Sequence, residues 1–581
     1  MYKLLNCIFF ILLVPGQMLA QKSFVIVNNS KSDYKIVISA NANEIEKQSA
    51  TILQDYIHKI SNCTLPIVTQ SASTQAHHII IGRNKFVNTN DVSGLGGDGV
   101  LIKKINNALI LTGGDRKGIL YSVYTLLEDY LGCRMYTVNV VEVPHTSSVT
   151  LPASIYKKQA PSFAYRTTLF LDALNNTFCD FHKMNYFFED VGLWVHSFET
   201  LLPKDKYFQS HPEYYALVNG KRNADQLDLT NPTTLTLVIQ NLRQLMKEKP
   251  DAKYWSVSPN DNANFCQCPK CTRLNNEQGS IQGSLLPFVN SVAKNFPDKQ
   301  ILHLAYLQYE KPPKTIKPVS NVLVMLATSD EERRVPLINQ PASLFKNHFQ
   351  DWSKITSQLF LWDYIVQFTN ALSPFPNLYT LQPNIKYFAS KNVKYIFEQG
   401  IGDFPGEFSE LRGYLISRLM WNINANVKAT IQEFTNGYYG KTGSVYINQY
   451  ISLIHKNASL KSALLKSGGS PVNAVNNYLS PENIQAYKDI FKSALNATAG
   501  TVYNERIMKE YVPVLYAELE VNKSNLAGNK RIGSADKNKY IETLNDFNKR
   551  TKQLKIIYLN EARLKVDDYY KNYTDILNNK Q

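Results

Sequence analysis

The sequence lacks several features that would assign it to a function class at once. Beyond its N-terminal segment it has no continuous apolar run of the roughly 18 residues that a membrane helix needs. No run of like charge stands out, and basic residues form no recognisable module with aromatics, so the net charge of +15 predicts a solvated basic surface and no nucleic-acid partner. Internal repeats are also absent. We therefore expect a globular protein without a membrane span.

Residues 1–20 have the layout of a cleaved secretory signal. One lysine precedes an apolar run from Cys7 to Val14 that is too short to cross a bilayer, and small residues follow. Cys7 lies too early to be the lipid-modified cysteine of a bacterial lipoprotein. We expect the mature protein to begin near Gln21 and to be exported, to the periplasm or the cell surface.

The chain is too long for one core, and its patterns predict an α/β multidomain protein of three parts. In residues 21–150, short β-like runs alternate with two helical segments, which predicts a small α/β domain. In residues 151–425, apolar runs that end in polar residues alternate with helical segments, which predicts a (β/α)8 TIM-like barrel. Residues 426–581 carry helical stripes and predict a C-terminal helical domain.

Six apolar runs mark the strands expected in the barrel: YRTTLFLD, YWSVSPND, ILHLAYLQYE, NVLVMLATSDE, QLFLWDY and YIFEQG. Active sites of such barrels form at the carboxyl ends of the strands. The polar residues that follow each run are therefore the candidate site residues.

Longer stretches carry a resemblance to known families. Residues 109–136, LILTGGDRKGILYSVYTLLEDYLGCRMY, resemble the N-terminal domain that precedes the barrel in alpha-glucuronidases and beta-hexosaminidases. Residues 192–222, 256–271 and 361–422 resemble the bacterial domain-of-unknown-function family 4838, part of which is placed in glycoside hydrolase family 163. The resemblance implies a glycosidase scaffold, with endo-beta-N-acetylglucosaminidase activity on N-glycans as its nearest specific activity.

Glycoside hydrolysis requires an acid for the leaving oxygen and a second group that acts as nucleophile, base or orienter. Glu398 leaves the apolar run YIF ahead of a glycine, and Asp363 lies between the aromatics Trp362 and Tyr364. Each is either catalytic or a partner in a structural ion pair. The glucuronidases that the scaffold resembles use an Asp and a Glu on late barrel strands, which implies the pair Asp363 and Glu398.

Asp261 is the third catalytic candidate, because it ends the run YWSVS near the position of the catalytic acidic pair of beta-hexosaminidase barrels. It either takes part in catalysis, orients the sugar, or, with Asn260, caps a helix or closes a turn. After NVLVMLA this chain has TSDEERRVPL where relatives have a cysteine-rich turn with a glutamate. Asp330 is the matching acidic position, with Glu331 also in reach.

Side chains at other strand ends complete the predicted sugar site. His196 and Arg166 follow runs in the first half of the barrel, and each either contacts substrate or is a hydrogen-bonded core residue. The aromatic candidates, which line a sugar subsite or pack in the core, are Trp255, Trp362, Tyr364 and Tyr306.

Cys266, Cys268 and Cys271 form a C-x-C-x-x-C cluster next to Asp261. In an exported chain they are consistent with a disulfide, with free thiols, or with a structural metal site that needs a fourth ligand such as His211 or His303. Under each alternative, we expect them to brace the loop on which Asn260 and Asp261 face the pocket.

The sequence thus predicts an exported glycoside hydrolase that acts on complex glycans without a cofactor, and carbohydrate is its only expected partner. The most specific prediction is an endo-beta-N-acetylglucosaminidase acting on N-glycans. The alternatives are a hydrolase of uronic-acid-containing or other polysaccharides, and a non-catalytic glycan-binding protein on a glycosidase scaffold.

Overall fold

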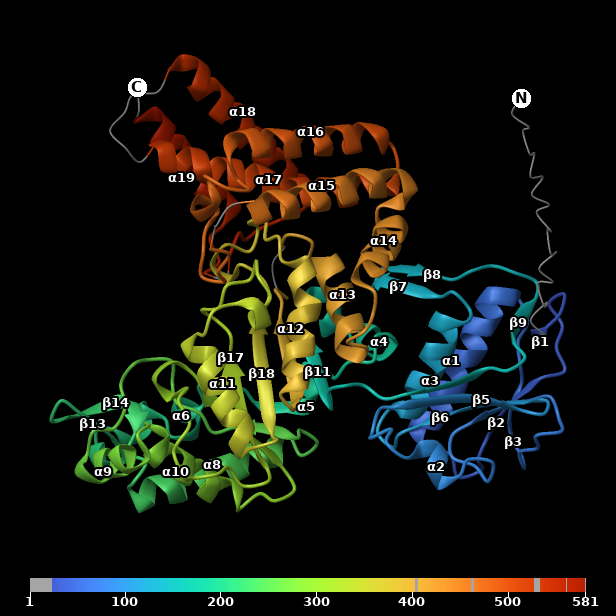
Figure 1. Cartoon of the computed structure of the whole chain (residues 1–581), viewed down its shortest axis with the longest axis horizontal. Coiled ribbons are helices and arrows are strands. Elements are labelled where there is room, and N and C mark those ends of the chain that lie inside the picture. Colours follow the sequence, from blue (N-terminus) through green and yellow to red (C-terminus); the bar gives the residue numbers. More distant parts are fainter. Residues whose placement is uncertain (1–22, 403–405, 461–463, 527–532, 561, 580–581) are drawn as a thin grey trace, which may run out of the picture. The chain divides into compact units, whose positions relative to one another are not determined.

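A computed structural model describes residues 23–402, 406–460, 464–526, 533–560 and 562–579 (Figure 1). The predicted signal segment, residues 1–20, lies outside them. The chain divides into two compact units. The N-terminal unit comprises Met1–Leu95, Gly99–Gly132 and Val143–Gln159, and the C-terminal unit comprises Gly96–Asp98, Cys133–Glu142 and Ala160–Gln581.

The N-terminal unit is an α/β fold, built on a six-stranded mixed sheet of order β10-β5-β6-β4-β2-β3. Its helix α1 starts at a capping box, in which Asn43 and Glu46 satisfy each other's backbone N–H groups. The strands of the unit are β1 (Ser23–Val27), β2 (Lys35–Ile38), β3 (Ile67–Thr69), β4 (His78–Ile81), β5 (Val100–Ile105), β6 (Ala108–Gly113), β9 (Val149–Pro152) and β10 (Tyr156–Gln159). The helices are α1 (Glu44–Ser61), α2 (Thr89–Val92) and α3 (Gly118–Asp129).

The C-terminal unit is built on a seven-stranded sheet in which all neighbouring strands are parallel. In sheet order the strands are β11 (Tyr165–Thr168), β19 (Val393–Gln399), β18 (Leu359–Tyr364), β17 (Val322–Ala327), β16 (Gln300–Ala305), β15 (Tyr254–Ser256) and β12 (Val191–Leu193). All six strands that the sequence predicts are present. The prediction missed β12, which has three residues and contains Gly192.

The sheet curls around one aromatic core to which all seven strands contribute. The ring of Tyr165 on β11 lies 4.6 Å from that of Tyr254 on β15, and the ring of Trp194, just after β12, lies 5.4 Å from that of Phe397 on β19. These contacts cross the interior between strands that are not neighbours in the sheet. The fold is thus a curled parallel half-barrel with β11 and β12 as its edges, and an eighth strand is not seen in the described residues.

Helices connect these strands and continue beyond them in the same unit. Those among the strands are α4 (Asn176–Phe181), α5 (Phe187–Asp190), α6 (Phe198–Leu201), α7 (Lys204–Tyr207), α8 (Pro232–Glu248), α9 (Pro269–Gln278), α10 (Gln282–Ala293), α11 (Leu344–Ile355) and α12 (Leu378–Ser390), and α13 (Ser409–Trp421) follows the last strand. Two hairpins are also present, β7 (Arg134–Thr137) with β8 (Val140–Glu142) and β13 (Tyr215–Val218) with β14 (Lys221–Leu227).

The region after the last strand is helical, as the sequence predicts, and lies in the same compact unit as the sheet. The helices α15, α16 and α17 pack side by side (Figure 1). The helices of this region are α14 (Val427–Tyr438), α15 (Gly440–Leu460), α16 (Pro481–Ala497), α17 (Val502–Leu526), α18 (Ser534–Gln553) and α19 (Val566–Asn578).

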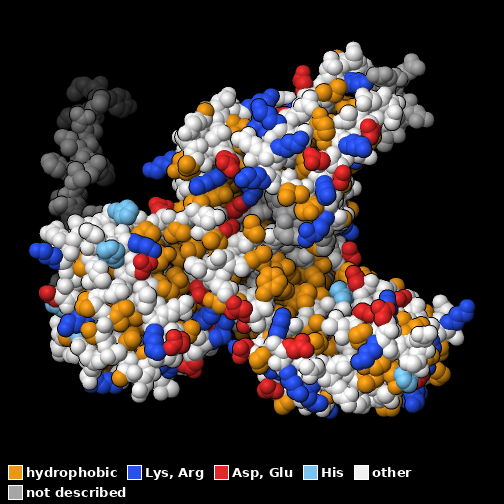
Figure 2. All heavy atoms as spheres, turned by 180° about the vertical axis from the view of Figure 1, so that it is seen from behind, with side chains coloured by type: hydrophobic (Ala, Val, Ile, Leu, Met, Phe, Trp, Pro, Cys, Tyr) orange, Lys and Arg blue, Asp and Glu red, His pale blue; other side chains and the backbone are white. Residues whose placement is uncertain are grey.

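The surface carries charges of both signs. On the face that Figure 2 shows, Lys and Arg side chains are interspersed with Asp and Glu. Within the described ranges, no helix combines the length and the apolar character needed to cross a membrane.

The aromatic core yields a stability prediction. Phe397→Ala should lower the free energy of unfolding by about 3–5 kcal/mol, because the buried ring contacts Trp194 and Trp362 and its loss leaves a cavity. Denaturant unfolding measures this change. Lys394→Ala, at an exposed residue of the same strand, is the matched control, and an equal loss in both variants would contradict the assignment of Phe397 to the core.

Candidate active site

The carboxyl ends of the parallel strands lie at one edge of the sheet, so the residues after each strand form the candidate site. Which of them face the interior is decided by the alternation of side chains along each strand. On β18, Phe360 and Trp362 belong to the interior cluster and Tyr364 packs against it, so Asp363 points to the outer face. On β19, Phe397 is interior and Glu398 points outward.

Asp363 is enclosed behind the sheet. Its side chain is 1 % exposed, and its Oδ1 accepts hydrogen bonds from the Thr328 hydroxyl at 2.5 Å and from the Arg333 guanidinium at 2.8 Å. Arg333 is itself buried and also donates to the Thr328 carbonyl. Asp363 therefore belongs to a structural ion pair that holds the turn after β17 against β18.

Glu398 lies opposite Asp363 in the register between β18 and β19. It is 0 % exposed, and neither of its carboxyl oxygens has a hydrogen-bond partner among the residues that the structure describes. Burial, and next the Asp363 charge, raise the pKa of Glu398 well above its ordinary value, while Arg333 lowers it. The predicted catalytic pair is therefore adjacent, as the sequence implies, but sealed from solvent on the outer face of the sheet.

Two other predicted substrate contacts are also on the outer face. Arg166 is 0 % exposed, and its guanidinium donates to Asp98 Oδ2 at 2.7 Å and to the carbonyls of Phe163 and Lys183. Trp255 is 1 % exposed and donates its indole N–H to a backbone carbonyl. Both are core residues in this structure, because alternation along β11 and β15 directs them away from the interior.

The accessible polar groups at the carboxyl edge gather around Tyr306, which follows β16. Asp261 follows β15 and Asp330 follows β17, and both are exposed. Burial of Tyr306, then the Asp261 charge, raise the pKa of its hydroxyl; a hydrogen bond with Ser329 lowers it, and the Asp330 charge raises it. Two solvent-exposed carboxylates thus act on one phenol.

His196 and Leu307 extend this cluster in strained backbone positions. Both have a left-handed φ, 58° and 49° respectively, which costs a non-glycine residue of the order of 1 kcal/mol. The His196 ring lies 3.0 Å from the Pro259 carbonyl through Nδ1. Both line a small hollow beside Asp261 and Tyr306 with a volume of about 10 Å³, which is room for about one water.

An aromatic wall lies on the interior side of the same edge. The rings of Trp362 and Tyr364 stack with centroids 5.3 Å apart and an interplanar angle of 8°. Trp362 donates its indole N–H to Gln399 Oε1, and its ring lies 5.7 Å from that of Trp194. Trp194 and Tyr364 are partly exposed, so they offer faces on which a sugar ring can stack.

The loop that carries Asp261 is fastened by its neighbours. The Asn260 side chain accepts from the Glu199 backbone N–H at 3.0 Å and donates to the Asp225 carbonyl at 2.8 Å. The Gln226 side chain donates to the Asn260 carbonyl and to Asn262 Oδ1. The amide of Asn260 is thus occupied in holding the loop, although its residue lines the hollow.

A segment of the C-terminal helical region completes the edge. The Ser467 hydroxyl donates to the Ser329 carbonyl, and the Phe368 backbone N–H donates to the Ser467 carbonyl at 2.8 Å. The Arg333 backbone N–H donates to the Leu465 carbonyl at 2.9 Å. Residues 465–469 therefore hold the loops after β17 and β18 in place through these hydrogen bonds.

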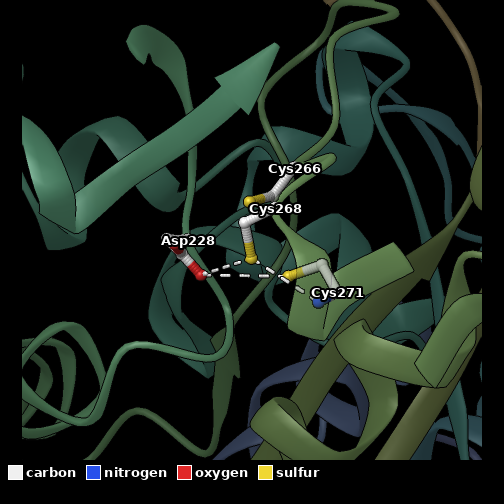
Figure 3. A group of neighbouring side chains, drawn as sticks. All are labelled: Asp228, Cys266, Cys268 and Cys271. Atoms are coloured by element: carbon white, nitrogen blue, oxygen red, sulfur yellow. Dashed lines mark hydrogen bonds between the residues drawn. The ribbon is translucent and has the colours of Figure 1, made fainter. Parts of the chain in front are cut away.

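The three clustered cysteines are buried thiols in this structure, with no disulfide among them. Their sulfurs gather with the carboxylate of Asp228, which follows β14, within 4.8 Å of one another (Figure 3). His211 and His303, the fourth ligands considered from sequence, lie elsewhere: His211 is exposed beside Glu213, and His303 is buried against Gln282. Asp228 is brought to the cysteines by the pairing of the β13–β14 hairpin with the cysteine loop. The spacing of residues in the sequence does not predict this pairing.

Glu398 yields a prediction that separates a structural from a catalytic role. Below about pH 4.5, its ordinary pKa, the carboxyl is protonated in both the folded and the unfolded chain; above it, the unfolded chain releases a proton that the folded chain keeps. Wild-type stability should therefore fall with rising pH relative to Glu398→Gln, as measured by unfolding from about pH 4 to about pH 8.

Activity and a second variant complete this test. Glu398→Gln should keep its activity, since a buried neutral acid is replaced by a neutral amide. Asp363→Asn should lower the free energy of unfolding by about 3–5 kcal/mol, because Arg333 remains buried without its counter-charge. A folded Glu398→Gln variant of unchanged stability and more than about hundredfold lower turnover would return Glu398 to the catalytic machinery.

Comparisons with solved structures relate this fold to glycoside hydrolases. A family 115 4-O-methyl-alpha-glucuronidase with specificity for decorated arabinogalactans matches 91% of this chain and 77% of its own at 11% identity, with a TM-score of 0.59. A family 138 enzyme targeting pectin rhamnogalacturonan II matches 94% of this chain and 98% of its own at 10% identity, with a TM-score of 0.44. A family 20 exo-beta-N-acetylglucosaminidase from Vibrio harveyi matches 74% of this chain and 75% of its own at 11% identity, with a TM-score of 0.39.

At 11% identity, the first of these matches shows likeness of fold alone. No curated protein matches the chain. A family model matches residues 135–452, which span all seven strands of the curled sheet and the candidate site. The chain therefore belongs to the family described as Domain of unknown function (DUF4838).

Proposed function

We propose that the protein is an exported glycoside hydrolase whose catalytic carboxylates are Asp261 and Asp330. The observation that supports this is the placement of two exposed acidic residues after β15 and β17, with their charges acting on the same Tyr306 hydroxyl. The glycosidase fold of the sheet and the position of active sites at the carboxyl ends of parallel strands agree with it.

Two carboxyl groups flanking one bond are what glycoside hydrolysis requires. One protonates the leaving glycosidic oxygen, while the other acts as nucleophile, activates a water, or orients a neighbouring acetamido group of the substrate. The Tyr306 hydroxyl, on which both charges act, would hydrogen-bond a sugar hydroxyl or the acetamido group. Trp194 and Tyr364 supply stacking faces on the interior side.

The preferred substrate is an N-glycan, cut by an endo-beta-N-acetylglucosaminidase reaction between the two core N-acetylglucosamines. This choice rests on the resemblance of the site-bearing segments, residues 256–271 and 361–422, to family 4838, part of which is placed in glycoside hydrolase family 163, whose activity this is. The second candidate substrate is a polysaccharide that contains uronic acids. The likeness of the fold to a 4-O-methyl-alpha-glucuronidase supports this candidate. A glycan-binding protein without catalysis is the third.

The proposal predicts that Asp261→Asn and Asp330→Asn each lower turnover by about 10²–10⁴-fold with little change in stability, because both side chains are exposed. Turnover is measured by mass spectrometry of the products from N-glycoprotein, free N-glycans and uronic-acid-containing polysaccharides. Asp251→Asn is the matched control, since this exposed aspartate lies just before the amino end of β15. It should retain wild-type turnover.

Each outcome distinguishes the candidate functions. Products cut between the core N-acetylglucosamines support the endo activity, and products from the polysaccharides alone support the second candidate. Saturable glycan binding without products from the folded wild type would leave the binding function. Full activity in both aspartate variants would remove this pair from the mechanism.

A further inference from the structure

We infer that Asp228, Cys266, Cys268 and Cys271 form a four-coordinate structural metal site whose preferred occupant is Zn²⁺. One ligand atom from each residue lies within 4.8 Å of all the others, and all four residues are buried. Figure 3 shows the sulfurs of Cys268 and Cys271 next to the Asp228 carboxylate, with Cys266 beside them. This site does not depend on the proposed glycosidase activity.

The separations between the Asp228 carboxylate and two of the sulfurs agree with a tetrahedron around zinc. With Zn–S of about 2.3 Å and Zn–O of about 2.1 Å, the edges of such a tetrahedron are roughly 3.6 Å for S to O and roughly 3.8 Å for S to S. The Asp228 Oδ1 atom lies 3.6 Å from Cys268 Sγ and 3.8 Å from Cys271 Sγ. Two edges of the group therefore match those of a zinc tetrahedron, and the remaining ones lie within 4.8 Å.

The surrounding groups suit thiolate ligands. Backbone N–H groups point at two sulfurs, from Leu217 to Cys266 Sγ and from Cys271 to Cys268 Sγ, each at 3.5 Å. Such hydrogen bonds stabilise the negative charge that bound sulfurs carry and orient the ligands.

The carboxylate is oriented in the same way. The second carboxylate oxygen of Asp228 accepts from the Arg222 guanidinium at 3.0 Å, and Oδ1 accepts from the Thr230 hydroxyl at 2.8 Å. The Arg222 charge also offsets part of the excess negative charge of three thiolates and one carboxylate around a divalent ion.

The ligand set selects the metal and its role. Thiolates favour zinc over the hard cations, and four protein ligands leave no open position for a substrate or water. The cysteines also form a small apolar cluster with Ala216, Leu217, Val218 and Leu229, apart from the main core. A metal ion gives this small cluster the stability that its own apolar area is too small to provide.

A disulfide explains the cluster less well. Three thiols face one another, so a disulfide would join two of them and leave the third beside the Asp228 carboxylate. The cluster has an odd number of sulfurs and a carboxylate directed at two of them, which is the arrangement of a metal site. Export into an oxidising compartment nevertheless makes oxidation the competing state to be tested.

The site joins the β13–β14 hairpin to the loop that carries Asp261. Asp228 immediately follows β14, and the Gln267 backbone N–H donates to the Leu217 carbonyl of β13 at 2.7 Å. Further along the same seam, Asn260 bonds to Asp225 and Gln226. Metal binding at one end of this seam therefore fixes the position of Asp261 at the other.

The test measures metal in the full chain, purified without chelators. Elemental analysis should give one zinc per chain, and X-ray absorption should give three sulfur neighbours at about 2.3 Å and one light ligand. Cys271→Ser should lower zinc affinity at least tenfold, whereas Cys63→Ser, a buried thiol of the N-terminal unit, should leave it unchanged.

A further variant keeps the test informative if Cys271→Ser fails to fold. Asp228→Cys supplies a fourth thiolate and should retain stoichiometric zinc. Intact-mass analysis of the wild type separates the competing states: a loss of two hydrogens with no metal, or three alkylatable thiols in a metal-free and fully stable protein, would overturn the inference. Because the readout is metal content, failure of the glycosidase proposal does not affect it.

Discussion

The alternation of side chains along the parallel strands is the constraint on which the rest of the structure depends. Because the sheet curls, one set of residues fills an aromatic interior and the next set packs under the helices. A shift of one position along a strand moves a polar side chain from the interior face of the sheet to the outer face, which the helices cover. This rule encloses Asp363 and Glu398 and leaves Asp261 and Asp330, in the loops after their strands, accessible.

Strand runs and helical stripes were sufficient to predict a mixed α/β multidomain fold, because long periodic segments carry a strong local signal. The predicted closed (β/α)8 barrel is a curled half-barrel of seven strands in the described residues. All six predicted strands are present. The strand β12 was missed because three residues are too few to show a recognisable strand pattern. Gly192 in that strand is required by packing, since a Cβ there would lie 2.3 Å from the Trp255 ring.

The candidate site was less predictable than the fold. Sequence places Glu398 at a strand end but does not say to which face it points, since that depends on which neighbours fill the interior. The groups around Tyr306 come from three loops whose meeting depends on strand order. Asp228 reaches the cysteines only through pairing between a hairpin and a distant loop. Nothing in the sequence of either segment indicates that the two pair.

The contact of residues 465–469 with the loops after β17 and β18 has a consequence for biosynthesis. The strands of the curled sheet are all synthesised before this segment, so the sheet can form while its open edge still lacks the Ser467 contacts. The loops that carry Ser329 and Phe368 therefore gain these bonds only after residues 465–469 have been synthesised, and the edge that holds Asp330 is completed by a segment more than a hundred residues further along the chain.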